Sequence, residues 1–188
     1  MNYISLGQSI EQMQNGKIGV IPTDTVYGVV ARASDTIAVK KLYSLKNRHK
    51  KPGTLIAADI QQLIDLGIKP RYLRAVSQYW PGAVTVVLPT DNLTLRYLDQ
   101  GVGTLAVRVV DNKQIADLLK MTGPLITSSA NIPGEPVANN IMQALDYFNN
   151  GVDFYVDGGD LSDRQASTII RILDDVVDVL RQGAVTIK

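Results

Sequence analysis

The sequence predicts an α/β fold, built as one domain with a twisted mixed sheet and flanking helices. Short apolar runs that end at proline, glycine or polar turns alternate with segments of helical spacing along the chain. Several of these runs follow one another with no helix between them, which favours a mixed sheet over a purely parallel one. No fixed-period repeat and no long linker divides the 188 residues, so we expect a single domain over 1–188.

The apolar runs predict strands because each is bounded by a turn signal. The first, Ile18 to Ile21, stops at Pro22 and leads into the polar turn Pro22-Thr23-Asp24-Thr25. Further strands are predicted at 54–58, 84–88, 105–110, 125–128, 154–156, 167–173 and 176–180, with a small edge strand at 185–187.

Helices are predicted where apolar residues recur at a spacing of three and four. Asp59 is a plausible cap for a helix over 59–66, and Ser34 or Asp35 for one over 35–47. The other helices are predicted at 8–15, 70–79, 112–120 and 139–148.

The composition excludes several kinds of chemistry. The chain has no cysteine, which removes disulfides, thiolate metal sites and cysteine nucleophiles, and its one histidine, His49, removes the usual histidine zinc site. The net charge of +1 argues against a general nucleic-acid coat. With no signal-like N-terminus and no apolar run near the roughly 20 residues of a membrane span, we expect a cytoplasmic protein without a membrane anchor.

A polar segment directly follows the first strand. Thr23, Asp24, Thr25 and Tyr27 place two hydroxyls, a carboxylate and a phenol within five positions. Alternate residues face alike, so Thr23 and Thr25 would line one wall and hydrogen-bond a small polar ligand. A turn followed by a helix cap is the alternative explanation.

A basic segment lies between residues 40 and 51, where six residues are lysine or arginine. Dense positive charge on a loop suits a polyphosphate, with Arg48 as a fork and Lys46 as a point charge. A solvated basic face and a tRNA contact are the alternatives.

Arg108 interrupts the apolar strand that surrounds it, Leu105 to Val109. A buried arginine needs a buried carboxylate or an anionic ligand. The sequence leaves open whether the partner is a structural carboxylate or the carboxylate of an amino-acid substrate.

Small polar residues end the strand at 125–128, giving Ser128-Ser129-Ala130-Asn131. Small side chains let a ligand approach the backbone, and Ser129 and Asn131 would face the same way. A plain serine and asparagine turn is the alternative.

Two nucleotide-binding motifs do not account for these segments. Gly101-Val102-Gly103-Thr104-Leu105-Ala106 has the spacing of a dinucleotide fingerprint, but a strand follows it where that motif requires a helix. No P-loop pattern is present.

The segments together resemble the YrdC-like family of threonylcarbamoyl-AMP synthases in its short form. The match runs in order from about residue 17 to about residue 184. It comprises P-T-D-T-V-Y-G at 22–28, K-x-R at 46–48, W-P-G-A-V-T at 80–85, L-A-V-R at 105–108, S-A-N-x-x-G at 129–134, A-S-T-I at 166–169 and R-x-G at 181–183.

The resemblance implies a large, open, positively lined cavity and a nucleotidyl transfer. L-threonine, bicarbonate and ATP would give threonylcarbamoyl-AMP and pyrophosphate, the first step in forming threonylcarbamoyladenosine in tRNA. Mg²⁺ would arrive with ATP, and no protein metal site is implied. Partner proteins would then transfer the threonylcarbamoyl group to tRNA, and a direct tRNA contact of the enzyme would use its basic segment.

The family pattern also implies roles for individual residues. The catalytic group would be Lys46, Arg48, Ser129 and Asn131. Threonine would be held by Thr25, Arg108, Ser129 and Ser167. ATP would be held by Lys46, Arg48, Asn131, Asn139 and Arg181.

The chain departs from the family pattern at residues 49–54, where His49 stands in place of the usual proline, so the path of this loop is open. Two other functions are alternatives. One is a non-catalytic RNA-binding protein that uses the basic cavity, although no aromatic stacking face is evident. The other is a carbamoyl-transferring domain like that of hydrogenase maturation proteins, which lies in longer chains with cysteine-rich zinc segments.

Overall fold

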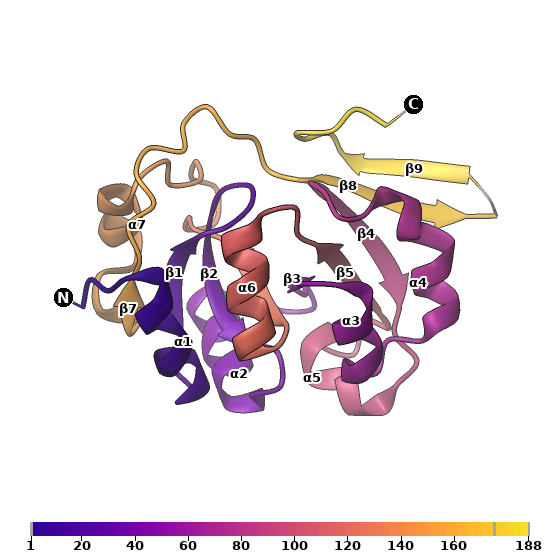
Figure 1. Cartoon of the computed structure of the whole chain (residues 1–188), viewed down its shortest axis with the longest axis horizontal. Coiled ribbons are helices and arrows are strands. Elements are labelled where there is room, and N and C mark those ends of the chain that lie inside the picture. Colours follow the sequence, from indigo (N-terminus) through magenta and orange to yellow (C-terminus); the bar gives the residue numbers. More distant parts are fainter. Residues whose placement is uncertain (1, 175, 188) are drawn as a thin grey trace.

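Nine strands form one mixed sheet in the computed structural model, which describes residues 2–174 and 176–187 (Figure 1). The order across the sheet is β7-β1-β2-β6-β3-β5-β4-β8-β9. Three neighbouring pairs are parallel, β1 with β7, β3 with β5 and β4 with β8, and the other five are antiparallel, which confirms the predicted mixed sheet. The strands are β1 (Gly19–Pro22), β2 (Tyr27–Arg32), β3 (Thr54–Ala57), β4 (Val84–Pro89), β5 (Thr104–Val109), β6 (Leu125–Ser129), β7 (Phe154–Tyr155), β8 (Thr168–Leu173) and β9 (Val176–Arg181).

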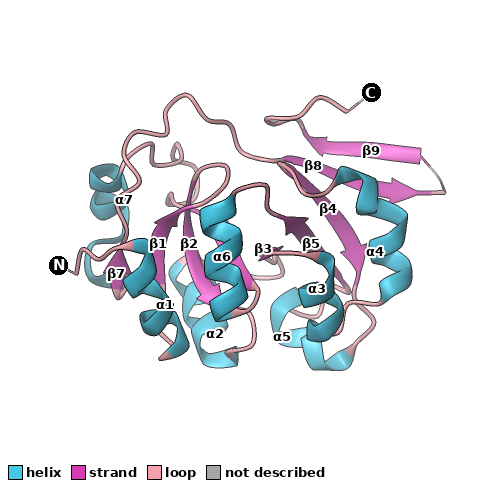
Figure 2. Cartoon of the chain, viewed as in Figure 1, coloured by secondary structure: helices cyan, strands magenta, loops and turns pink. Residues whose placement is uncertain are grey.

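Seven α-helices flank this sheet within the described residues (Figure 2). Side-chain caps begin several of them, and the cap of α2 is Asp35, whose carboxylate accepts from the N–H groups of Ile37 and Ala38. Asp59 caps α3, as predicted. The helices are α1 (Leu6–Gln14), α2 (Thr36–Leu45), α3 (Ile60–Leu66), α4 (Pro70–Val76), α5 (Arg96–Asp99), α6 (Lys113–Thr122) and α7 (Ile141–Phe148).

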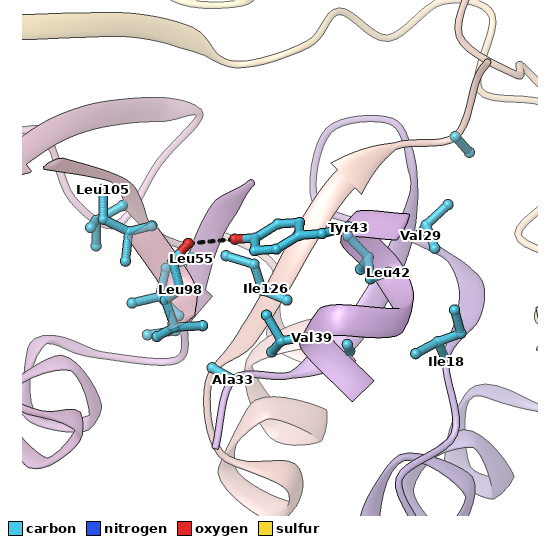
Figure 3. Packing of buried hydrophobic residues seen from close by; sticks show 14 of the residues in the cluster. Ile18, Val29, Ala33, Val39, Leu42, Tyr43, Leu55, Leu98, Leu105 and Ile126 are labelled. Atoms are coloured by element: carbon cyan, nitrogen blue, oxygen red, sulfur yellow. Dashed lines mark hydrogen bonds between the residues drawn. The ribbon is translucent and has the colours of Figure 1, made fainter. Parts of the chain in front are cut away.

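Two apolar clusters form the core. Successive strand residues point to opposite faces of the sheet, so Val29 belongs to the larger cluster and Val30 to the smaller one. The smaller cluster lies under α1 and α6, and the larger one takes residues from α2, α3, α4, α5 and α7. Figure 3 shows part of the larger cluster, where the Tyr43 hydroxyl of α2 donates to the Leu98 carbonyl over 2.6 Å.

The structure corrects two sequence expectations. Strand β2 was not predicted, although it forms a hairpin with β1 and its six residues are all apolar except Gly28 and Arg32. The predicted edge strand at 185–187 is wrong. Val185 forms no ladder, because its N–H and carbonyl both bond to the hydroxyl of Thr168.

One long irregular segment decides where the functional residues meet. Residues 156–167 leave β7 at one edge of the sheet and cross to β8, near the other edge (Figure 1). The Tyr27 hydroxyl anchors this crossing, donating to the Gly159 carbonyl over 2.9 Å and accepting from the Gly158 N–H over 2.7 Å. The crossing delivers Ser167 to the strand ends beside β4.

No helix among the described residues is long and apolar enough to cross a lipid bilayer.

Candidate active site

Strand ends and the β1–β2 turn enclose a cleft of about 160 Å³. Thr23 and Thr25 line one wall, as predicted from their spacing, and their hydroxyls lie 3.2 Å apart. The lining also includes Arg48, Thr54, Ala106, Arg108, Thr127, Ser128, Ser129, Ser167, Ile169 and Arg181.

Arg108 lies at the centre of the cleft's polar contacts. It is 3% exposed, and its Nη2 donates to Asp24 Oδ1 over 2.8 Å. The same nitrogen is 3.4 Å from the Thr25 hydroxyl, and Nη1 donates to the Thr85 hydroxyl over 3.2 Å. Asp24, with its side chain 3% exposed, is therefore the buried carboxylate that an arginine in an apolar strand requires.

The contacts continue from Arg108 to the last strand. The hydroxyls of Thr85 and Ser167 are 2.8 Å apart. Arg181 of β9 donates to the Ser167 carbonyl over 2.7 Å and lies 3.4 Å from its hydroxyl. The pKa of Arg181 is lowered by burial and by the nearby charge of Arg108. Arg181 thus contacts Ser167 directly, and Arg108 is linked to it through the Thr85 hydroxyl. Two arginines from different strands near one serine suit an anionic ligand.

Lys46, Ser129 and Asn131 form a second group, beside the cleft. The Lys46 ammonium donates to the carbonyls of Ser129, over 3.0 Å, and of Asn131, and is 3.3 Å from Asn131 Oδ1. The Ser129 hydroxyl donates to Asn131 Oδ1 over 2.8 Å. Of the three, Ser129 lines the cleft, and the other two lie behind it.

The ammonium of Lys46 is unusually buried for a charged group, with the residue 5% exposed. Burial, and then the charge of Arg48, lower the pKa of Lys46 to about 8. The ring of Phe148 lies 5.4 Å from the nitrogen and favours the charged form. Lys46 therefore changes charge close to the physiological pH range.

Arg48 belongs to the loop where the chain departs from the family pattern, and the structure shows the path of that loop. Its Nη1 donates to the carbonyls of Lys51, over 3.0 Å, and Pro52, over 2.9 Å, and its Nε donates to the Ser128 hydroxyl over 3.2 Å. The Gly53 N–H donates to the Tyr43 hydroxyl over 3.2 Å. The loop thus folds around the Arg48 guanidinium.

Two motif glycines are required by close approach of backbones at the cleft. A Cβ on Gly28 would lie 2.5 Å from the Thr127 hydroxyl. A Cβ on Gly183 would lie 2.2 Å from the Ala166 carbonyl oxygen and 2.6 Å from the Ser167 carbonyl carbon. The glycine of R-x-G therefore lets the chain after β9 pass against Ser167, so that Arg181 reaches it.

The W-P-G segment positions the start of β4. The Trp80 indole N–H donates to the Val84 carbonyl over 2.8 Å, and the Gly82 N–H donates to the Val109 carbonyl over 3.0 Å. These bonds fix β4 against the end of β5, which places Thr85 beside Arg108.

The structure brings most predicted site residues together, with one exception. Thr25, Arg48, Arg108, Ser129, Ser167 and Arg181 line the cleft, while Lys46 and Asn131 support its wall. Asn139 does not line it. It borders a separate hollow of about 400 Å³ beside α7, where its N–H donates to Gln143 and its carbonyl accepts from Leu161.

Three residues with direct contacts were not assigned roles from the sequence, namely Asp24, Thr85 and Ser128. Each lay inside a segment already noticed. The sequence signal that could have assigned Asp24 a role was the arginine in the apolar strand. The buried charge of Arg108 requires a carboxylate partner, and Asp24 is that partner.

The cleft is open and lined by three arginines, with no carboxylate among its lining residues. It adjoins a second hollow of about 370 Å³ through Thr25, which borders both. By itself the cleft is smaller than the roughly 300–1,000 Å³ of typical small-molecule sites. Asp24 and Asp163 line the second hollow together with Arg164. The structure therefore shows a small cationic cleft next to a hollow of mixed charge, rather than the single large positively lined cavity that was predicted.

A family model built from Sua5, YciO and YrdC proteins, described as "Telomere recombination", matches residues 11–183. This chain belongs to the Sua5/YciO/YrdC family.

Individual members of the Sua5/YciO/YrdC family are similar over most of the chain. A threonylcarbamoyl-AMP synthase of Bacillus subtilis is 33% identical over 187 residues, which is 96% of this chain and 54% of that protein. One of Pseudomonas fluorescens is 31% identical over 88% of this chain and 91% of its own length. The chain thus spans about half of the first relative and nearly all of the second.

A solved structure from the family has the same fold. Sua5 of Pyrococcus abyssi, in complex with L-threonine, superposes with a TM-score of 0.83 at 28% identity, covering 97% of this chain and 56% of that protein.

Proposed function

We propose that this protein makes threonylcarbamoyl-AMP from L-threonine, bicarbonate and ATP, and releases pyrophosphate. The observation that carries the proposal is the convergence of Arg48, Arg108 and Arg181 on one cleft with Ser129 and Ser167. Identities of 31–33% to proteins named threonylcarbamoyl-AMP synthase support it. They also favour an enzyme over a non-catalytic RNA-binding protein.

Threonine would bind at the Arg108 side. Its carboxylate would accept from Arg108 and from the hydroxyls of Thr25 and Ser167, which lie around the guanidinium. Asp24 keeps that guanidinium in place while one face meets the ligand. The proposal gains support from a family structure that contains L-threonine.

ATP would bind at the side of Arg48, Lys46 and Arg181. The Lys46 ammonium has three donors, and all three are bonded to acceptors of the 129–131 turn. To contact a phosphate, Lys46 would have to give up one of these bonds. The bond lost would be one to Ser129 or Asn131. Asn139 remains a proposed ATP contact only if the nucleotide extends toward α7.

The chemistry needs no covalent enzyme nucleophile. The threonine amine adds to CO₂ and loses a proton, giving a carbamate. If bicarbonate reacts directly, its C–OH bond breaks and the hydroxide leaves as water with the amine's proton. A carbamate oxygen then attacks the α-phosphorus of ATP, the bond to the β-phosphate oxygen breaks, and pyrophosphate leaves. Charge that develops on the phosphates would be stabilised by Lys46 and Arg48, so positioning and cationic stabilisation provide the catalysis.

Mg²⁺ belongs to this proposal as the ion that ATP carries. Among residues 2–174 and 176–187 there is no group of three histidine or carboxylate side chains placed to hold a metal. The phosphates would therefore supply most of its ligands. We further propose that the enzyme works in the cytoplasm and hands its product to a threonylcarbamoyl-transferring partner. Contact with tRNA would use Lys50 and Lys51, the exposed lysines at the end of the 40–51 segment.

The test mixes protein, ATP, Mg²⁺, L-threonine and bicarbonate, and measures pyrophosphate. We expect release that depends on threonine and falls at least about a hundredfold in Lys46→Ala or Asn131→Ala, as for loss of one electrostatic contact to a transition state. Lys41→Ala is the matched control, because Lys41 is bonded to Asp153, away from the cleft. Absence of threonine-dependent release in the wild-type protein, with tight tRNA binding, would overturn the proposal.

A further inference from the structure

A hollow larger than the cleft lies outside it. It is a groove of about 620 Å³ between α2 and α5, here called the α2–α5 groove. Its lining residues are Thr36, Ile37, Lys40, Tyr43, Ser44, Arg48, His49, Tyr97 and Gln100. None of the residues that would hold threonine borders it.

The charge of the α2–α5 groove is one-sided. Lys40, Arg48 and His49 line it, and no carboxylate does. Two acidic groups lie near it. Asp35 joins burial in raising the pKa of Tyr97, and Asp99 joins burial in raising the pKa of Tyr43. Asp35 caps the first turn of α2, whereas Arg48 follows the last turn, so that end of the groove is cationic.

The other end offers an aromatic ring and an exposed apolar side chain. Tyr97 lines it, and Ile37, on the first turn of α2, is 80% exposed. Such a surface suits a planar ring, which stacks on phenol faces and covers aliphatic carbon. Lys40 follows Ile37 by one turn of α2, so a cationic side chain lies next to the surface that suits a ring.

A buried donor without a partner lies on the same lining. The Nε2 atom of Gln100 is one of three buried side-chain nitrogens in the described chain with no hydrogen-bond partner. Gln100 has φ of 53°, the left-handed region, at the end of α5. Buried polar groups are nearly always satisfied, so an acceptor supplied by a ligand would resolve this exception once the Gln100 side chain turns its amide into the groove.

We propose that the α2–α5 groove binds a small molecule that joins a planar ring to a phosphate, of the mononucleotide class. The phosphate would lie against Lys40, Arg48 and His49, and an acceptor on the sugar or ring would take the bond from Gln100. Arg48 borders both the groove and the cleft, so a ligand bound at one site would change the affinity of the other.

The test is an NMR titration of the ¹⁵N-labelled full chain with AMP, following the side-chain amide of Gln100 and the backbone amides of α2. AMP binding in the cleft is recorded separately, at Ser129 and Arg181. Ribose 5-phosphate and adenosine serve as half-ligands. We expect saturable shifts at Gln100 with AMP, weaker ones with ribose 5-phosphate, and affinity about tenfold lower in Lys40→Ala, the size of one charged hydrogen bond.

Lys41→Ala is the control, because Lys41 is next in sequence but bonds to Asp153. It should bind AMP at the groove with unchanged affinity. Three outcomes overturn the proposal: no shift at Gln100 with AMP, equal affinity in Lys40→Ala and wild type, or shifts at Gln100 with tRNA only. Because pyrophosphate release is assayed independently, loss of the groove site leaves the proposed enzymatic function standing.

Discussion

Arg108 and Arg48 both face the cleft, but the chain holds them by different means. Arg108 lies on a central strand and contacts the side chains of Asp24, Thr25 and Thr85, which come from two other parts of the sheet. Arg48 lies on a loop, and two of its three bonds go to carbonyls within four residues of itself. One half of the cleft is thus part of the sheet's own structure, and the other half is a local loop.

Because the two arginines are held differently, mutations at them should differ in how far they affect the stability of the protein and its ligand binding. Removing a group from the Arg108 half leaves a buried partner without its bond, which is costly. Removing a group from the Arg48 half leaves carbonyls that water can reach. We therefore expect mutations in the first half to unfold the protein as well as inactivate it, and mutations in the second half mainly to weaken binding.

The largest expected effect is that of Arg108→Ala. It leaves Asp24 buried and unpaired, so the free energy of unfolding should fall by about 3–5 kcal/mol, measured by urea denaturation. The double variant Asp24→Asn/Arg108→Ala should recover part of that loss because no charge is then left alone. If the single variant were as stable as wild type, the Arg108 half would not be structural.

Arg108→Ala should also weaken threonine more than ATP. Calorimetric titration of whatever fraction is folded gives both affinities. Equal losses for the two ligands would contradict the threonine role of Arg108.

Gly28→Ala should have the next largest effect. The added methyl group would overlap the Thr127 hydroxyl, at 2.5 Å, and overpacking of this kind costs about 1–3 kcal/mol. Thermal unfolding measures it. Gly7→Ala in α1 is the control, since its nearest neighbour is at 4.0 Å, and it should be neutral or slightly stabilising.

The pH dependence of ATP binding tests the Lys46 side. The pKa of Lys46 is lowered to about 8, so the amine is charged below that pH and neutral above it. Affinity for ATP, measured without threonine, should fall as pH rises through 8 and be about tenfold lower near pH 9. Lys46→Met should bind weakly and show no such step. An unchanged step in that variant would assign it to another group.

The smallest expected effect on stability is that of Arg48→Ala. Because its lost partners are loop carbonyls and one hydroxyl, the free energy of unfolding should drop by about 1 kcal/mol. ATP affinity should fall in the same variant. A stability loss as large as that of Arg108→Ala would remove the distinction between the two halves.

Periodicity and turn signals predicted most of the sheet, because strands such as β4 and β5 are apolar runs bounded by glycine, proline or polar turn residues. They did not reveal β2, since its run begins inside the polar motif at Tyr27 and Gly28. The short helix α5 was also missed, because four residues give no periodic signal.

The motifs predicted which residues form the site, but they did not predict the hydrogen bonds and ion pairs among those residues. The sequence showed that Arg108 needs a partner, but it could not choose between Asp24 and a substrate carboxylate, because that depends on how the β1–β2 turn folds over β5. It placed Lys46 at a phosphate, whereas its present acceptors are carbonyls of the 129–131 turn. Asn139 follows that turn in sequence, yet the turn directs it away from the cleft.

The contact between Arg181 and Ser167 has a consequence for how the protein is made. Strand β9 supplies Arg181, while the opposite wall comes from residues 23–28, so the cleft joins segments from both ends of the described chain. During translation the ribosome releases residues 23–28 long before β9 emerges. A growing chain therefore carries most of the residues that line the cleft before the cleft itself is complete, because Arg181 arrives only with the final hairpin.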